Sequence, residues 1–322
     1  MHRVMLSALA GFLLLTNTAS AQSDYPSRPV RIVVPTAPGG AADTTARMLA
    51  QHLSKELGQQ FFVENKPGAG NIIGIEAVTR SPGDGYTLLL GAATITLNHV
   101  VHAKLPYDVE RDLVPVTQMT SVPNALVVHP SQPFRSLGEF IAAAKAKPGQ
   151  LTYASAGVGS NLHLTMELLK HMAGINVVHV PYKGVGPAMQ DLLAGHVNSM
   201  ISNVASARAQ VAGGQLRAIA VTSSQRVAAL PDVPTMAEAG LPGFEVLNWF
   251  GLFAPAGTPA PIVDRIQAEA ARMMTSDEFK RRMAAEGADP VGSKPAEFAA
   301  FIKAEIKKWD NVAKAANIQK TE

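Results

Sequence analysis

Short runs of β-branched apolar residues alternate along this chain with stretches in which apolar residues recur every three or four positions. The first run ends at Pro35, and Ala46, Leu49 and Leu53 follow at helical spacing after a turn with two glycines. A continuous apolar run is typical of a buried strand, and the wider spacing is typical of a helix with one buried face. The pattern therefore predicts a strand, a tight turn over 35–40 and a helix.

The same unit of strand, turn and helix repeats over most of the chain. Strands are predicted at 31–34, 61–65, 86–90, 125–128, 151–154, 177–180, 197–201, 216–221 and 246–254. Helices are predicted at 43–57, 72–80, 137–146, 162–173, 187–194, 205–212, 261–274 and 295–315. Strands that alternate with helices form a parallel sheet covered on both faces. The predicted fold class is α/β, with each domain a mostly parallel sheet flanked by helices.

The pattern restarts near Pro123, which predicts a second domain over residues 124–245. The two tail helices have no partner strands of their own, so we expect them to pack back on the first block of the chain. The first domain would then be discontinuous and comprise residues 22–123 and 246–322. The two crossovers between the domains, 121–124 and 245–249, would act as hinges.

The first 21 residues have the features of a secretory signal peptide. A basic start at His2 and Arg3 precedes an apolar run, and Ala19 and Ala21 flank a small-residue cleavage site. No later segment is long and apolar enough to cross a membrane. We therefore expect residues 1–21 to be removed and the mature protein to be periplasmic.

Composition excludes several classes of function. The chain has no cysteine, so it forms no disulfide and has no thiol catalysis. Its formal net charge is only +3, which does not indicate a nucleic-acid partner. It lacks the GxSxG, SxxK, HExxH and Walker motifs, and its histidines do not have the spacing of a metal site. We expect no catalytic residue, no metal and no cofactor.

The turn after the first strand is a candidate anion site formed by Thr36, Ala37, Pro38, Gly39 and Gly40. Glycine allows the backbone to approach a ligand closely. The start of a helix presents unpaired N–H groups and the positive end of its dipole. No Lys or Arg occurs between Arg31 and Arg47, so backbone groups would hold the anion. The alternative is an ordinary turn between a strand and a helix.

A second turn, formed by Ser155, Ala156, Gly157, Gly159 and Ser160, repeats this arrangement. Ligands of open α/β sheets bind outside the carboxyl ends of the strands. Two facing domains would bring both turns to one cleft, where they would hold an anionic group from opposite sides.

Six stretches together resemble one known family. They are TAPGGAADTTARMLA, ENKPGAGNIIG, SPGDGYTLLLG, YASAGVGSNLHL, VHVPYKGVGPAMQDLLAGHV and LPDVPTMAEAGLPGFEVLNWFGLFAPAGTP. In their order and combination they resemble the Bug family, the TctC-like periplasmic solute-binding proteins of tripartite tricarboxylate transporters. The resemblance implies a type II-like periplasmic binding protein with two domains that close on a small carboxylate. It places the ligand between the turns 36–40 and 155–160.

Five further residues are candidate ligand contacts: Asp43, Asn71, His163, Lys183 and Asn203. Asp43 is alternatively a structural acid in the first helical turn, His163 a structural histidine and Lys183 a solvated lysine. Ser160 is alternatively a helix cap. The resemblance supplies the histidine at 163. It also shows a departure, because the family often has Asp-Asn where this chain has Ser202 and Asn203.

The leading hypothesis is a periplasmic receptor that captures a small carboxylate and delivers it to the membrane subunits of a transporter. We expect it to be a monomer and not an enzyme. Two alternatives stay open: an exported enzyme that acts on a carboxylate, and a ligand-sensing lobe for a membrane signalling protein. The sequence does not predict which carboxylate is bound, because backbone N–H groups contact the carboxylate group and not the rest of the ligand.

Overall fold

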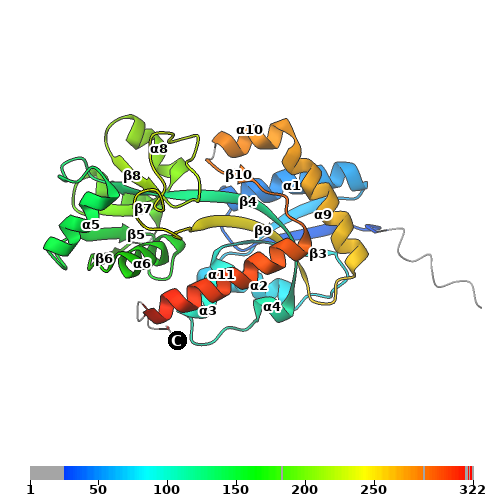
Figure 1. Ribbon diagram of the computed structural model, residues 1–322. Coiled ribbons are helices and arrows are strands. Elements are labelled where there is room, and N and C mark those ends of the chain that lie inside the picture. The colour runs from blue at the N-terminus through cyan, green and yellow to red at the C-terminus, as the bar shows by residue number, and fades with distance from the viewer. Residues whose placement is uncertain (1–24, 183, 286, 316–317, 319, 321–322) are drawn as a thin grey trace, which may run out of the picture.

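A computed structural model describes residues 25–182, 184–285, 287–315, 318 and 320. Two groups of elements, which we call the first and the second lobe, are joined by two long strands that run between them (Figure 1). The predicted signal peptide and Lys183 lie outside the described residues. None of the helices in the described ranges combines the length and the apolar character that a bilayer crossing requires.

The first lobe is built on three parallel strands that the sequence pattern predicted. Its strands are β1 (Val30–Val34), β2 (Phe61–Asn65) and β3 (Thr87–Ala92), and its helices are α1 (Ala41–Leu57), α2 (Ile72–Thr79), α3 (Thr94–Val101) and α4 (Val109–Asp112). The strand β1 pairs with β2 on one side and with β3 on the other, in parallel on both. All but one of the residues of β1 are buried, as its continuous apolar run requires.

The two joining strands make the sheet continuous through both lobes. They are β4 (Leu113–Val128) and β9 (Leu247–Pro255), and they pair antiparallel along most of their length. The first part of β4 pairs with β9, and the part from Asn124 onward pairs antiparallel with two strands of the second lobe. The resulting sheet is mixed: strands within each lobe run in parallel, whereas those that meet β4 and β9 are antiparallel.

Only the last four residues of β4 were predicted as a strand. Pro115, Pro123 and a polar stretch between them interrupt the apolar pattern, and proline normally argues against a central strand. The register of β4 against β9 shifts twice, once between Pro115 and Thr117 and again before Thr120. Such irregularities accommodate residues that a regular ladder excludes.

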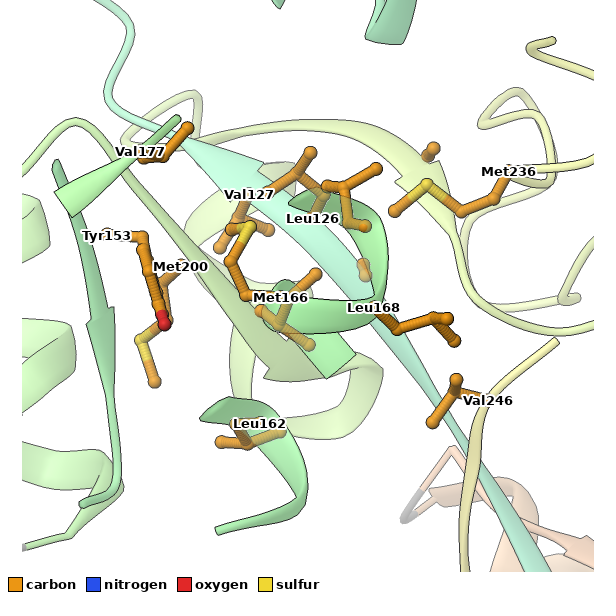
Figure 2. Packing of buried hydrophobic residues seen from close by; sticks show 14 of the residues in the cluster. Leu126, Val127, Tyr153, Leu162, Met166, Leu168, Val177, Met200, Met236 and Val246 are labelled. Atoms are coloured by element: carbon orange, nitrogen blue, oxygen red, sulfur yellow. The ribbon is translucent and has the colours of Figure 1, made fainter. Parts of the chain in front are cut away.

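The second lobe follows the predicted order of strands and helices. Its elements are α5 (Leu137–Ala146), β5 (Thr152–Ser155), α6 (Asn161–Ala173), β6 (Val178–Pro181), α7 (Val185–Leu193), β7 (Ser199–Asn203), α8 (Val204–Ala212) and β8 (Arg217–Val221). The strand β5 pairs in parallel with β6 and β7. Figure 2 shows part of the core of this lobe, to which β4 contributes Leu126 and Val127, α6 contributes Met166 and β7 contributes Met200.

The tail of the chain returns to the first lobe but does not stay within it. It comprises α9 (Ala260–Thr275), α10 (Asp277–Ala285), β10 (Asp289–Pro290) and α11 (Pro295–Ala315). The helix α9 packs on α1 and β4 as expected. The helix α11 packs on β4 and α3 and also on α6, and its residues Trp309 and Val312 belong to the core of the second lobe. The domain boundaries stay a prediction.

Candidate functional site

The turn after β1 brings the glycines of the first lobe to the start of α1. Gly39 has a φ of +88°, which favours glycine, and its N–H donates to Asp43 Oδ2 at 3.0 Å. Gly40 is the N-cap residue and has no side chain to accept from the first amides of α1. Because those amides also lack carbonyl partners inside the helix, they are the groups of this turn that can bind an anion.

Asp43 is buried and accepts hydrogen bonds from three donors. Besides Gly39, these are Arg47 Nε at 2.9 Å and Asn65 Nδ2 at 3.0 Å. The hydrogen bond from Arg47 is the largest reason that the pKa of Asp43 is lowered to about 2. These contacts favour the structural role of Asp43, and its contact with a ligand stays a prediction.

The turn after β5 differs from our expectation because its glycine amides already have acceptors. Gly157 N–H donates to Ser155 Oγ at 3.1 Å, and Gly159 N–H donates to His163 Nδ1 at 3.1 Å. Ser160 Oγ accepts from His163 N–H at 3.2 Å and so caps α6, the structural alternative named above. An anion could use the two glycine amides only by replacing these side chains.

His163 lies in a stack of rings that the sequence pattern did not reveal. Its ring is stacked on His179 of β6 with the centroids 4.1 Å apart, and His179 is stacked in turn on Tyr153 at 4.8 Å. Burial, and to a lesser extent the nearby His179, lowers the pKa of His163 to about 4. The neutral ring that results can accept a hydrogen bond at Nδ1. His163 is therefore integral to the turn, and its contact with a ligand stays a prediction.

A cavity of about 210 Å³ lies where the two lobes meet. We call it the interlobe cavity. Its lining consists of Gly39, Ala41 and Thr44 of the first turn and α1, Asn203, Ala205 and Ser206 at the start of α8, Thr120 and Val122 of β4, Phe250 of β9, Arg282 and Met283 of α10, and Ala288. It therefore joins two predicted ligand residues, Gly39 and Asn203, from opposite lobes.

The chemistry of the interlobe cavity suits an anion. The starts of α1 and α8 both line it, and neither helix has a side-chain cap among the described residues. Two helix N-termini contribute unpaired N–H groups and the positive ends of two dipoles. The hydroxyl of Thr120, a residue that is fully buried, is without a hydrogen-bond partner in the described part of the chain. A buried hydroxyl of this kind is costly unless a ligand or a water molecule satisfies it.

The other predicted residues lie outside the lining of this cavity. Ala37 and Pro38 are exposed, and Thr36 Oγ1 is buried without a partner among the described residues. Asn71 Nδ2 donates to Thr94 Oγ1 at 2.7 Å. The carbonyl of Ala156 accepts from Gly184 N–H at 3.2 Å. These residues, with the turn after β5, stay predictions as ligand contacts.

The turn after β5 instead meets α3 of the first lobe. A Cβ atom built on Gly159 would lie 2.7 Å from a methyl group of Val101, so only glycine fits at this contact. Ser202, which replaces the acid that the family often has, is fully buried, and its Oγ donates to the carbonyl of Asn203 at 3.4 Å. A neutral side chain suits that position because burying a carboxylate without a partner is costly.

Two larger cavities suit an anion less well. One of about 480 Å³ lies beside the joining strands, and its lining has two exposed carboxylates, Glu245 and Asp289, against one cation, Arg226. The other, of about 400 Å³, lies between α1, α9 and α10, and its lining has Glu56 and Glu278 together with Lys55 and His52. Neither lining contains the first residues of a helix that begins at a glycine turn, a feature that the interlobe cavity has in Ala41.

Several lining residues were missed by the sequence reasoning. Thr120 lies in the part of β4 that was not predicted, and Arg282 lies on α10, a helix that was not predicted although its buried residues Phe279 and Met283 are four positions apart. The neighbouring aromatic residues Trp249 and Phe250 of β9 have different surroundings. Trp249 is fully buried against Phe298 of α11, whereas Phe250 lines the cavity.

Two lobes that share a mixed sheet and enclose a cavity between them define the class of the solute-binding proteins. Residues 45–318 match the family described as "Tripartite tricarboxylate transporter family receptor". Protein BugT of Bordetella pertussis is 39% identical over 319 residues, which cover 98% of each chain. The chain belongs to this receptor family.

Solved structures of related proteins have the same fold. The structure of R. palustris Rpa4515 with adipate is 37% identical, covers 92% of this chain and 100% of its own, and superposes with a TM-score of 0.80. The structure of MatC from Rhodopseudomonas palustris with bound malate is 35% identical, covers 89% of this chain and 99% of its own, and has a TM-score of 0.75.

Proposed function

We propose that this protein captures a small carboxylate in the interlobe cavity and delivers it to the membrane subunits of a tripartite tricarboxylate transporter. The observation that carries the proposal is that the starts of α1 and α8, one from each lobe, line the same cavity. Adipate and malate, the molecules bound to two related structures, are both dicarboxylates. Unpaired backbone N–H groups at a helix N-terminus bind anions, carboxylates among them.

A ligand that contacts both helix starts stabilises the conformation in which the lobes are closed on it. The closure would be a hinge motion at the joining strands, at 121–124 of β4 and 245–249 beside and within β9. Thr120 and Phe250, which line the cavity, lie directly beside these hinges in the sequence. Ligand contact and hinge conformation would thus be coupled over a few residues.

The remaining parts of the proposal concern location and partners. We propose that residues 1–21 direct export and are removed, that the mature protein works as a monomer in the periplasm, and that it releases its ligand without changing it chemically. Family membership supports the transporter partner, because the family is one of receptors.

The test removes one backbone donor from the cavity. Ala41 is the first residue of α1, a position that tolerates proline, so Ala41→Pro deletes its N–H while it preserves the helix. A hydrogen bond to a charged group is worth about 1.5–3 kcal/mol, so calorimetry with malate and with adipate should show affinity reduced by about 10- to 100-fold. The matched control is Ala260→Pro, at the first position of α9 and outside the cavity lining, which should bind like the wild type.

Two results would overturn the proposal. One is that the wild-type protein binds no member of a panel of small carboxylates and carries none through native mass spectrometry. The other is that NMR shows the carboxylate converted to a product, which would indicate an enzyme. If Ala41→Pro and Ala260→Pro bind the carboxylates with equal affinity, the start of α1 is not part of the binding site.

A further inference from the structure

The turn after β5 is fastened by two histidines that come from different elements. On α6, His163 Nδ1 accepts the hydrogen bond from Gly159 N–H at 3.1 Å. On β6, His179 Nε2 lies 2.7 Å from Ser155 Oγ, which itself accepts from Gly157 N–H at 3.1 Å. The N–H of Gly159 is thus hydrogen-bonded directly to an imidazole, and the N–H of Gly157 is connected to the other imidazole through the hydroxyl of Ser155.

The two imidazoles also hold each other in place. They are stacked at 4.1 Å with planes 15° apart, and His163 is only 7% exposed. Since both rings are packed face to face, neither can turn without displacing the other. The positive φ values of Gly157 and Gly159, +129° and +77°, are therefore supported by Ser155 at the start of the turn and by two histidines outside it.

We propose that His163 and His179 are positioning residues that set the shape of the turn after β5 for ligand capture. This inference rests on the proposed function, because the turn is where the second lobe meets α3 of the first lobe. A Cβ atom on Gly159 would lie 2.7 Å from a methyl group of Val101, so the shape of the turn affects how the lobes close on a ligand in the interlobe cavity. The decisive atom is His163 Nδ1, which must be an acceptor. His163 acts without contacting the ligand, through its hydrogen bond with the N–H of Gly159.

The surroundings of the pair favour the required neutral form. The groups that face it are Tyr153 of β5 and Glu167 and Lys170 of α6. Glu167 Oε1 accepts from Tyr153 Oη at 2.5 Å and from Lys170 Nζ at 2.6 Å, so its charge is already neutralised by partners. Burial lowers the pKa of both histidines. A neutral His163 that accepts at Nδ1 carries its proton on Nε2.

The test separates the acceptor atom from the ring. In His163→Asn the side-chain Oδ1 is bonded to Cγ, as Nδ1 is in histidine, so it can accept from Gly159 N–H, whereas His163→Leu has no acceptor. His171→Asn is the matched control, because His171 is an exposed residue of the same helix. Calorimetry with malate and adipate near neutral pH measures affinity, and hydrogen exchange of the Gly159 amide reports on the turn without any ligand.

The expected results are a loss of affinity of about tenfold or more in His163→Leu, as for one lost hydrogen bond in the segment that packs against the first lobe, and affinity close to that of the wild type in the two Asn variants. Exchange of the Gly159 amide should be accelerated only in His163→Leu, and ¹⁵N NMR of the wild type should show an unprotonated Nδ1 on His163. Equal behaviour of His163→Leu and the wild type would overturn the inference, as would equal losses in His163→Leu and His163→Asn.

Failure of the proposed function gives a different result. The wild-type protein could bind no carboxylate while the Gly159 amide exchanges faster only in His163→Leu. In that case the histidines do shape the turn, but the turn does not serve carboxylate capture. If that amide remains equally protected in His163→Leu, the positioning role itself is wrong.

Discussion

Asp43 accepts hydrogen bonds from the first turn, from its own helix and from the end of β2, so one buried carboxylate ties three segments of the first lobe together. His163 has the corresponding position in the second lobe, where it joins the turn after β5 to α6 and stacks on β6. Both residues were chosen from the sequence as candidate ligand contacts. In both cases the side chain forms hydrogen bonds within the protein, and its contact with a ligand stays a prediction.

At the residue scale we predict that His163 makes stability depend on pH. Its pKa is about 4 in the folded protein against a usual value of 6.5, so the unfolded chain binds more protons between these values. The contribution is fully present above about pH 6.5 and falls as the pH is lowered, so that by about pH 4 the protein has lost about 3 kcal/mol of stability.

Urea unfolding at several pH values measures this effect, and His163→Asn, which cannot take up that proton, is the control. As the pH falls, the free energy of unfolding of the wild type should decrease relative to that of His163→Asn. A difference that is constant over this range would contradict the prediction.

At the scale of elements, two helical glycines that look alike in the sequence have opposite surroundings. Gly74 of α2 lies against the turn after β1, and a Cβ atom there would be 2.7 Å from Pro35 Cβ and 2.8 Å from the carbonyl oxygen of Lys66. A Cβ atom on Gly186 of α7 would meet no atom within 4 Å. Only the first glycine is therefore needed for helix packing, and it holds α2 close to the strand that leads into the site.

We predict that Gly74→Ala lowers the free energy of unfolding by about 1–3 kcal/mol, because backbone must move to make room. Gly186→Ala, the matched control, should leave stability unchanged or raise it by up to about 1 kcal/mol, because alanine favours a helix. Thermal unfolding and urea titration measure both variants. Equal stability of the two would show that α2 can shift away from Pro35 without cost.

At the scale of the whole molecule, the last helix connects the lobes independently of the joining strands. The helix α11 lies along the first lobe and reaches the second (Figure 1). Phe298 belongs to a core cluster of the first lobe, and Trp309 belongs to the core of the second. Trp309 is fully buried, and its Nε1 donates to Glu305 Oε2 at 3.0 Å.

We predict that Trp309→Ala lowers the free energy of unfolding by about 3–5 kcal/mol, the usual cost of truncating a buried aromatic residue. Lys307→Ala, at an exposed position of the same helix, should change it by no more than about 0.5 kcal/mol. Denaturant unfolding followed by circular dichroism compares them. A Trp309→Ala protein as stable as Lys307→Ala would mean that α11 does not contribute to the second lobe in solution.

The sequence by itself determined most of the strands and helices, their order, and the two glycine turns that follow β1 and β5. These features depend on local spacing and on the conformational freedom of glycine, both of which can be recognised over a few residues. It also determined two members of the cavity lining, Gly39 and Asn203. The resemblance of its motifs correctly identified the receptor family.

Only the tertiary structure decided which groups of those turns are open to a ligand. Asn65 and His179 approach the turns from distant elements, and His163 approaches from the helix that follows its turn. Their hydrogen bonds decide which amides and carboxylates are already engaged. The long strand β4, the wall residue Thr120 and the reach of α11 to the second lobe were likewise not predictable from local pattern. Each of them depends on strand pairing and packing between residues far apart in the chain, which the spacing of apolar positions does not encode.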